Sequence, residues 1–345
     1  MIRFHLGFPA PSITDLRMTD NAALAELAEG LGFDTLWHSN QRFYREMFVR
    51  MTSSVVATSR MGIGGAVAEP FAVHPVLTAQ SLATVDELSG GRATLALGAG
   101  GSGFQMMGVQ RRRSARAIRE AYAIMKGVLA GEEVTYAGEL VSAQRARLEF
   151  RLERPPTLWV ASRGDVTLGT AGEYADAVII ATYASPDGVG AAADLVRQGA
   201  ARAGRAPEGV RLMSRVDTCV HQDAGAAFDG TRIMVARFLW SSYPDRNFVR
   251  REGLEVPDDV EALIAKRDYG LVPEAAALLP NDFVRGVTWA GSPDMVAERV
   301  AAIHRATGIE DFGMWALLAP GQTREEAMRL IGEEVAPRVH SLLAA

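Results

Sequence analysis

Residues 62–98 read GIGGAVAEPFAVHPVLTAQSLATVDELSGGRATLALG and contain the pattern that decides the fold. An apolar run at 62–67 is followed by a stretch with helical spacing at 74–88, and a second apolar run follows at 93–98. Short apolar runs that alternate with amphipathic helices are typical of βαβ units, in which helical crossovers join parallel strands. This stretch therefore predicts a strand, a helix and a second strand of one parallel sheet.

The same alternation extends along most of the chain. Apolar runs predict further strands at 2–8, 34–37, 157–161, 176–181, 210–220 and 311–317. Helical spacing predicts helices near 20–31, 44–58, 111–129, 165–174 and 188–203, and two more that begin after Ser292 and Thr323. Thr19 or Asp20 is expected to cap the first helix, and Pro337 is expected to interrupt the last one. Eight strands with helical crossovers favour an α/β fold, the (β/α)8 TIM barrel, over an open doubly wound sheet.

Two stretches depart from the alternation. Residues 132–152 alternate apolar and polar side chains on both sides of Ala137-Gly138, which predicts an antiparallel excursion with its second strand at 148–152. A long stretch without a clear strand follows 210–220, and we interpret residues 241–290 as an insertion. The chain is therefore expected to form one barrel domain over 1–345 with two insertions.

Composition excludes several classes of protein. With 48% hydrophobic and 22% charged residues in 345, the chain has a large core and is not disordered. Its net charge of −5 gives no electrostatic basis for nucleic-acid binding. A single cysteine, Cys219, excludes a disulfide framework and a multi-thiolate metal site. No signal peptide and no membrane-spanning run is recognisable, so we expect a cytoplasmic protein that acts on a small molecule or a modified peptide.

The residues that follow the strands are the candidates for the functional site, because barrel enzymes place their sites at the carboxyl ends of the strands. Ala66 and Val67 end a run of small residues where a flat ligand can approach the backbone, although a tight turn explains the run equally well. Gly100 and Gly101 belong to a glycine-rich loop at 98–103 that either accommodates a cofactor or is a flexible connection. The loop does not match the dinucleotide-binding pattern.

The segment Ser162-Arg163-Gly164-Asp165 leads directly from a strand into a helix. Free backbone N–H groups and the helix dipole would face an anion there, and Arg163 and Ser162 can add hydrogen bonds. An ordinary helix cap by Asp165 is the alternative. The segment predicts an anion-binding site.

Few side chains suit proton transfer. His38 follows the second strand and has an ordinary pKa suited to catalysis near neutral pH, so it is the candidate proton donor, with water as the alternative. Arg215 and Asp217 share one face of a strand and form a charged pair that points either into the barrel or outward. No Ser–His–acid, HExxH or CxxC pattern is present, and no metal ligands are predicted.

Several of these motifs resemble those of a known family, the bacterial luciferase-like superfamily. The motifs are Leu31–Trp37, His74-Pro75, Asp86–Arg92 and Leu95–Gly98. Ala161–Gly164 and Glu173–Ile179 are similar, more narrowly, to the methylenetetrahydromethanopterin reductase branch. The resemblance covers about residues 1–220 and 286–340, and it implies a TIM barrel, a homodimer, and FMN or the deazaflavin coenzyme F420 as cofactor.

The resemblance also assigns residues. It places a non-proline cis peptide at Ala66–Val67 behind the cofactor ring, and a phosphate site at 162–166, while Asp86–Arg92 lies at the stability face of the barrel. Where many relatives carry Asp-His after the second strand, this chain has Asn40-Gln41, which cannot serve as an acid or a base. The cofactor-binding residues expected on these grounds are Phe8, Asn40, Ala66, Val67, Gly100, Gly101, Ala161, Ser162, Arg163, Gly164, Asp165 and Thr182.

The leading hypothesis is a deazaflavin-dependent oxidoreductase that transfers a hydride between the cofactor and an activated C=C, C=N or carbonyl carbon. The Ser-Arg-Gly segment favours F420 over FMN, as does the strong bias to arginine, since Lys126 and Lys266 are the only lysines. An FMN-dependent two-component monooxygenase and a non-catalytic flavin-binding barrel are the alternatives.

Overall fold

The computed structural model describes residues 2–101 and 103–344 and divides into two compact units. The first unit contains His5–Ile180 and Asp194–Met213. The second unit contains the N-terminal residues up to Phe4, then Ala181–Ala193, and all residues from Ser214 onward. Three residues lie outside the described part of the chain: Met1, Ser102 and Ala345. All three belong to the predicted domain 1–345, and Ser102 also belongs to the glycine-rich loop.

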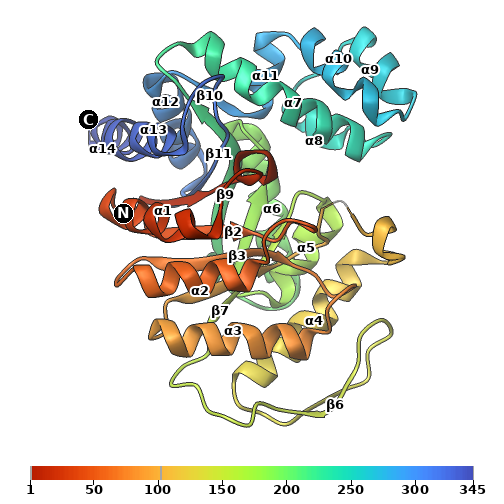
Figure 1. The fold of residues 1–345 in the computed structure, drawn as a ribbon. Coiled ribbons are helices and arrows are strands. Elements are labelled where there is room, and N and C mark those ends of the chain that lie inside the picture. The colour runs from red at the N-terminus through yellow and green to blue at the C-terminus, as the bar shows by residue number, and fades with distance from the viewer. Residues whose placement is uncertain (1, 102, 345) are drawn as a thin grey trace. The chain divides into compact units, whose positions relative to one another are not determined.

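Parallel strands form the sheet of the first unit. In the order in which they pair they are β1 (Arg3–Gly7), β2 (Thr35–Ser39), β3 (Gly62–Ala68), β4 (Ala93–Leu97), β7 (Thr157–Ser162) and β8 (Ala177–Ala181). The helices that connect them are α1 (Met18–Gly30), α2 (Met47–Ala57), α3 (Pro75–Ser89), α4 (Ser114–Leu129) and α5 (Asp165–Tyr174), and α6 (Pro186–Arg202) follows β8. Short 3-10 turns occur at Ala10–Ile13, Gln105–Met107 and Pro207–Gly209. Figure 1 shows α2 beside α3, and α3 beside α4, next to the strands of this unit.

The second unit contains β9 (Arg211–Val220), β10 (Trp289–Gly291) and β11 (Asp311–Ala316), and β10 pairs in parallel with β9. Its helices are α7 (Ala224–Ser242), α8 (Asn247–Arg251), α9 (Asp258–Ala265), α10 (Val272–Leu278), α11 (Asn281–Val287), α12 (Pro293–Thr307), α13 (Arg324–Arg329) and α14 (Ala336–Ala344). A 3-10 turn at Tyr269–Leu271 precedes α10, and a π-helical segment at Leu330–Val335 joins α13 to α14.

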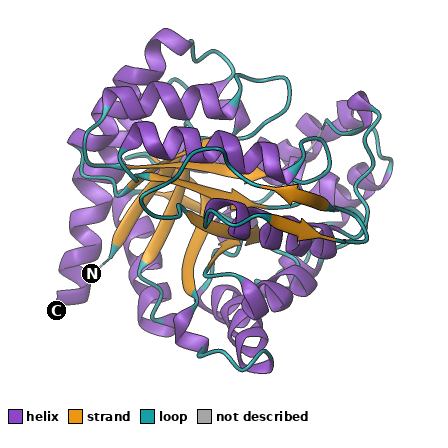
Figure 2. Ribbon diagram, turned by 90° about the horizontal axis from the view of Figure 1, so that it is seen from below, coloured by secondary structure: helices purple, strands orange, loops and turns teal. Residues whose placement is uncertain are grey.

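The architecture is a (β/α)8 TIM barrel, as predicted, with helices on the outer face of the parallel strands (Figure 2). Apolar side chains fill the core, and those of Trp37 and Trp159 meet edge to face at 6.1 Å between ring centroids. None of the helices in the described part of the chain is long and apolar enough to cross a membrane.

Three local expectations differ from the structure. Helix α1 begins at Met18 after Arg17, so Thr19 and Asp20 lie inside its first turn and do not cap it. The excursion at 132–152 pairs β5 (Val134–Tyr136) with β6 (Ala143–Ala146), and residues 148–152 form no strand. Pro337 does not end the last helix, because it lies in the first turn of α14, where the missing N–H has no helical partner to lose.

The position of β6 follows from the carboxylate of Glu120 on α4. This side chain is 2% exposed, and its oxygens accept hydrogen bonds from the backbone N–H groups of Glu139, Leu140 and Val141. The three N–H groups converge on one carboxylate only if the chain turns at these residues, so the return strand begins directly after them.

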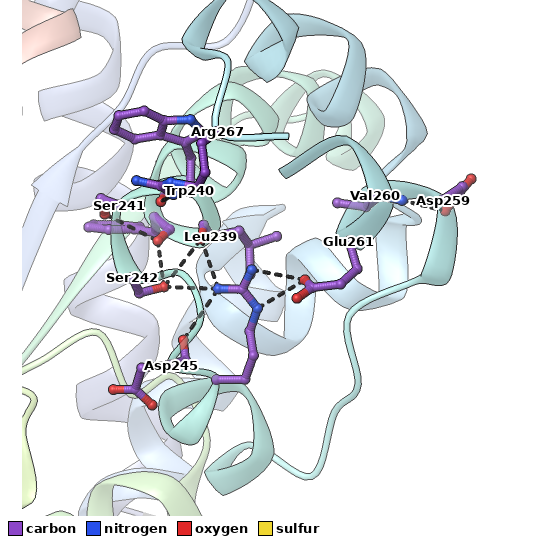
Figure 3. A network of polar contacts seen from close by, with 11 residues as sticks. Leu239, Trp240, Ser241, Ser242, Asp245, Asp259, Val260, Glu261 and Arg267 are labelled. Carbon is purple, nitrogen blue, oxygen red and sulfur yellow. Dashed lines mark hydrogen bonds and ion pairs between the residues drawn. The ribbon is translucent and has the colours of Figure 1, made fainter. Parts of the chain in front are cut away.

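Arg246 connects parts of the insertion at 241–290 to one another and to α7. Figure 3 labels two of its partners, Leu239 and Glu261. Its guanidinium donates two hydrogen bonds to Glu261 of α9, at 3.0 and 2.8 Å, and one to the carbonyl of Leu239 in the last turn of α7, at 2.8 Å. A cation at this position satisfies carbonyl groups that have no helical partner. The side chain therefore links α7 to α9.

The motif Asp86–Arg92 is structural, as predicted. Arg92 donates hydrogen bonds to the carbonyl groups of Val55, Thr58 and Met61, which end α2 and lead into β3. Asp86 accepts a hydrogen bond from the backbone N–H of Ala93 at the start of β4. These contacts lie at the amino ends of β3 and β4, away from the strand ends that carry barrel sites.

Glu29, in the last turn of α1, holds the turn that leads into β3. Its carboxylate accepts hydrogen bonds from the N–H groups of Ser59, Arg60 and Met61. Burial acts to raise the pKa of Glu29, but these hydrogen bonds lower it to about 2. The ionised form is therefore the one that the fold stabilises.

We predict that Glu29→Gln lowers the free energy of unfolding at pH 7 by about 1–3 kcal/mol. Because the pKa is lower in the folded state, this contribution is complete above the ordinary carboxyl pKa of 4.5 and disappears as the pH falls toward 2. Urea unfolding at pH 7 and pH 3 measures it, and Glu26→Gln on the exposed face of α1 is the matched control. An equal loss of stability at both pH values would contradict the assignment.

Candidate active site

The end of β3 carries the bulge that the resemblance places behind a cofactor. The register against β4 shifts between Ala66 and Ala68, and the peptide bond between Ala66 and Val67 is cis, as expected. Both residues are half-buried, so part of their surface remains accessible within their unit.

Asn40, directly after β2, holds this bulge. Its backbone N–H donates to the carbonyl of Ala66 (2.9 Å), and its side-chain Nδ2 donates to the carbonyl of Val67 (3.0 Å). The side-chain amide is therefore engaged with the backbone on which the ring is expected to rest. This assigns Asn40 a positioning role beside the cofactor-binding role that the sequence predicted.

The ends of three neighbouring strands meet at Gly98. A Cβ atom at Gly98 would lie 3.1 Å from Cβ of Val67 and 3.1 Å from the carbonyl oxygen of Ala161. The structure thus brings together Val67 near the end of β3, the glycine-rich loop after β4, and Ala161 near the end of β7. A side chain at Gly98 would require these neighbours to shift, so glycine suits the position where the three strand ends converge.

Gly64 and Gly65, in contrast, serve packing within the protein. A Cβ atom at Gly64 would lie 2.5 Å from the ring of Trp37, and one at Gly65 would lie 2.8 Å from Leu95. These two glycines make room for large core side chains. The small residues at 64–65 therefore need no ligand to explain them.

The glycine-rich loop packs on an arginine that the sequence analysis did not single out. Arg42 forms a 2.9 Å ion pair with Glu69, with side chains only 8% and 3% exposed, and stacks on the ring of Phe104 at 3.5 Å. A Cβ atom at Gly100 would lie 2.9 Å from this guanidinium, and Gly101 lies beside Gln41. Arg42 follows β2 and Glu69 follows β3, and these strands are neighbours in the sheet. The sequence could therefore have predicted this ion pair from the positions of the two residues after adjacent parallel strands.

The segment predicted to bind an anion joins the end of β7 to the start of α5. Gly164 precedes the first residue of α5, and the one atom near the position of its missing Cβ is the Ser162 hydroxyl oxygen, at 3.8 Å. That oxygen accepts a hydrogen bond from the Gly164 N–H (3.0 Å) and leaves the hydroxyl proton available for a ligand. Asp165, the alternative cap, is exposed and is the first residue of α5, while Gly164 holds the N-cap position. The first N–H groups of α5 therefore remain free of helical partners.

Phe8 and Thr182 are two further residues that the sequence analysis predicted to bind the cofactor. Phe8 is 3% exposed, and its carbonyl accepts a hydrogen bond from Ser39 (2.7 Å), so its ring belongs to the core of its unit. Thr182, in the second unit, has a backbone φ of 72°, which a β-branched residue rarely adopts. Such strain often marks a functional position, but the cofactor-binding role of Thr182 stays a prediction.

His38 faces α2. Its Nε2 lies 3.0 Å from the Ser54 hydroxyl, and the side-chain amide of Asn21 donates to the same hydroxyl (3.0 Å). The residue is 1% exposed; burial lowers the pKa of His38 well below its usual value, and the nearby Arg50 lowers it further. A neutral imidazole enclosed in the helix layer cannot protonate a ligand at the strand ends. The catalytic role predicted for His38 is therefore replaced by a structural one, because the alternation of β2 turns the ring outward.

The charged pair on β9 is buried. Arg215 donates to Asp217 (2.8 Å), and its guanidinium lies 4.6 Å from the ring centroid of Trp315 on β11. Burial lowers the pKa of Arg215, and Asp217 opposes this shift. Asp217 is held by this ion pair, and its side chain is 2% exposed. In the described part of the chain, no group of three histidine, cysteine or acidic side chains is arranged to hold a metal ion.

We predict that the stability of the protein falls as the pH drops below about 6.5, by up to about 1.4 kcal/mol per pH unit from His38. The unfolded chain takes up a proton there that the folded His38 does not accept. His38→Gln removes this dependence, so the stability of the variant relative to the wild type should rise from pH 7 to pH 5. Urea unfolding measures it, with exposed His340→Gln as the control. Parallel pH profiles for the wild type and His38→Gln would contradict a buried neutral imidazole.

Comparisons with known proteins agree with this geometry. Residues 3–310 match the family model described as luciferase-like monooxygenase. The chain is 29% identical to 5,10-methylenetetrahydromethanopterin reductase of Methanolobus tindarius over 320 residues, which cover 91% of this chain and 94% of that protein. The reductase of the same name from Methanopyrus kandleri is 28% identical over 354 residues, covering 96% and 98%. The solved structure of the coenzyme F420-dependent tetrahydromethanopterin reductase of Methanopyrus kandleri superposes with a TM-score of 0.84 at 26% identity, covering 98% of this chain and 99% of that one.

Proposed function

Because the chain belongs to the luciferase-like monooxygenase family, we propose that it is a coenzyme F420-dependent oxidoreductase. The similarity over nearly the full length to an F420-dependent reductase carries this proposal. It transfers a hydride between reduced cofactor and an activated C=C, C=N or carbonyl carbon of a small molecule or a modified peptide. The enzyme works in the cytoplasm as a homodimer.

The described residues fit a phosphate-bearing cofactor with a flat ring. The start of α5 at Gly164, beside the Ser162 hydroxyl, suits a phosphate group because the first N–H groups of a helix have no helical partners, and Arg163 adds positive charge in the same segment. The bulge at Ala66–Val67 offers a backbone surface for the ring, and Asn40 fixes its two carbonyl groups.

When bound, F420 supplies the hydride, and the protein supplies orientation. Reduction of a double bond also requires a proton at the second atom. The amides Asn40 and Gln41 have no proton to give at neutral pH, and His38 faces α2. The proton therefore comes from water or from the substrate itself.

We predict that the purified protein binds oxidised F420 in preference to FMN in parallel fluorescence titrations. Arg163→Ala should weaken F420 binding at least tenfold, because a charge-assisted hydrogen bond contributes about 1.5–3 kcal/mol. Gly164→Val should weaken it more, because the side chain fills the space in front of α5. The control is Arg329→Ala in α13. It removes an exposed arginine that pairs with Glu333 and does not belong to α5.

Each alternative has its own outcome. Preferential binding of FMN, or a requirement for oxygen in turnover, would indicate the two-component monooxygenase. Binding of F420 without hydride transfer to any activated double bond would indicate a non-catalytic barrel. Unchanged affinity in both variants would move the phosphate away from α5.

An apolar surface on α2 and α3 supports the homodimer. Val49 and Val56 are 57% and 74% exposed, and Leu77 and Leu88 are both 55% exposed. Their spacings of seven and eleven residues place each pair on one face of its helix. Because α2 and α3 contact each other, these exposed apolar side chains lie on neighbouring helices, and we propose that the two helices form the dimer interface.

We predict that Val56→Glu combined with Leu77→Glu converts the dimer to a monomer in analytical ultracentrifugation, because two carboxylates would be buried in the interface. Thr84→Glu at an exposed position on α3 serves as a control for added charge. A monomeric wild-type protein, or a double variant that remains dimeric, would remove α2 and α3 from the interface.

A further inference from the structure

Phe43, in the loop between β2 and α2, combines an exposed ring with a strained backbone. Its side chain is 69% exposed, so the ring removes little apolar surface from water when the chain folds. Its backbone φ is 67°, in the left-handed region that residues other than glycine rarely adopt. Neither feature stabilises the fold. Strain of this kind persists only where the surroundings enforce it, and it is concentrated at functional positions.

Contacts with other loops fix the chain on both sides of Phe43. Before it, the buried guanidinium of Arg42 pairs with Glu69 after β3 at 2.9 Å. After it, Nη1 of Arg45 donates a hydrogen bond of 2.7 Å to the carbonyl of Thr14, which lies between β1 and α1. The backbone at Phe43 is therefore anchored in its left-handed conformation, and the ring is kept at the surface.

Phe43 lines a surface hollow of about 410 Å³ together with Thr14, Tyr44 and Arg45. This volume lies within the roughly 300–1,000 Å³ typical of small-molecule sites. Thr14 belongs to the loop after β1, and the other three residues belong to the loop after β2. Loops at the carboxyl ends of barrel strands carry the active sites of such proteins. The hollow therefore lies on the face of the first unit that carries the candidate site.

The ring of Phe43 also adjoins the glycine-rich loop after β4. A Cβ atom at Gly103 would lie 3.3 Å from Cε2 of this ring. Three residues before Phe43, Asn40 donates hydrogen bonds to the bulge at Ala66–Val67. A ligand in the hollow would therefore contact a ring that belongs to the same loop as the residue holding the bulge.

The side chains around the hollow favour a planar aromatic group. Phe43 and Tyr44 supply two aromatic rings, and Arg45 supplies a guanidinium group. Aromatic rings pack on one another at their edges and faces, and a guanidinium packs on the face of a ring. The four lining residues include no carboxylate, so they offer no partner for a cationic group.

We propose that the hollow is a substrate subsite in which Phe43 contacts a planar aromatic group of the substrate. The inference rests on the proposed function and narrows its substrates to molecules that carry an aromatic group beside the activated C=C, C=N or carbonyl carbon. Binding covers the apolar surface of Phe43 that folding leaves exposed. Because the anchored loop already holds the ring in place, binding does not have to order it.

Two matched ketones test this subsite on the full-length protein. Benzylideneacetone and ethylideneacetone carry the same conjugated carbonyl group and differ only by a phenyl group in place of a methyl group. Ligand-observed NMR titrations give each Kd, both with oxidised F420, which has no hydride to transfer, and with the cofactor-free protein. Benzylideneacetone is expected to bind about tenfold more tightly in both forms. Equal affinities of the two ketones would overturn the proposal.

Variants of Phe43 locate the preference. Phe43→Ala should weaken benzylideneacetone binding about tenfold, whereas Phe43→Tyr, which keeps the ring, should retain it. Phe43→Gly should lose the preference too, yet unfold at a higher urea concentration than Phe43→Ala, because glycine adopts this backbone conformation without strain. Tyr269→Ala, which removes an exposed ring in the second unit, is the control. A preference that survives in Phe43→Ala, or is lost equally in Tyr269→Ala, would overturn the assignment.

Two further measurements separate the subsite from the proposed cofactor site and dimer interface. Phe43→Ala should bind oxidised F420 with wild-type affinity and should sediment as the wild type does. Equal losses of F420 and ketone affinity would assign the ring to the cofactor, and dissociation of the dimer would assign it to the interface; either result would overturn the proposal. Failure of the wild type to bind F420 would instead contradict the proposed function, because the ketone preference is also measured without cofactor.

Discussion

The two hydrogen bonds from Asn40 to the carbonyl groups of Ala66 and Val67 are the contacts on which the candidate site depends. A bulge at the carboxyl end of a parallel strand leaves carbonyl groups without ladder partners, and such groups must be satisfied wherever they are shielded from water. Asn40, which follows the neighbouring strand β2, donates hydrogen bonds to two of these carbonyl groups. The backbone surface expected to support the cofactor is therefore positioned by β2 as well as by β3, which makes the sequence after β2 part of the site.

The same requirement explains four acidic side chains that are buried or half-buried in the fold. Glu29, Glu69, Glu120 and Glu252 each accept hydrogen bonds from two or more successive backbone N–H groups. In each case the carboxylate holds a turn outside the regular elements, where the chain has no strand or helix partner. Carboxylates suit this task because they offer several acceptor positions and bind N–H groups more strongly than neutral acceptors do. Acidic residues here stabilise loops, and their burial is not evidence of acid–base catalysis.

The sequence predicted the barrel because its principal strands are continuous apolar runs and its helices have regular spacing. It missed β10, because the three residues Trp289–Gly291 are too short to form a pattern. It also placed the return strand of the first insertion at 148–152, because hydrophobic alternation cannot reveal the hydrogen bonds by which Glu120 fixes the turn.

The site was predicted where local sequence determines it and missed where it depends on contacts between strands. Ser162-Arg163-Gly164 and the bulge at Ala66–Val67 are each a continuous segment: the first leads from a strand into a helix and the second contains the cis peptide, as expected, while the anion-binding role stays a prediction. The pairing of Arg42 with Glu69 joins residues far apart in sequence, so only the parallel sheet brings them together. His38 was misassigned because a shift of one residue along a strand reverses the direction of a side chain.

These positions limit the chemistry that the chain itself can perform. Glu69 is paired with Arg42 and with the backbone, Asp217 is paired with Arg215, and His38 faces α2. The residues that follow β2 in place of an acid and a base are amides, and the amide of Asn40 is engaged with the bulge. Under the proposed function, a cofactor site flanked by these amides would suit substrates whose reacting carbon accepts a hydride readily and whose neighbouring atom takes its proton from water. Iminium and conjugated carbonyl groups meet this condition, because positive charge or conjugation makes the hydride acceptor reactive without an acid from the protein.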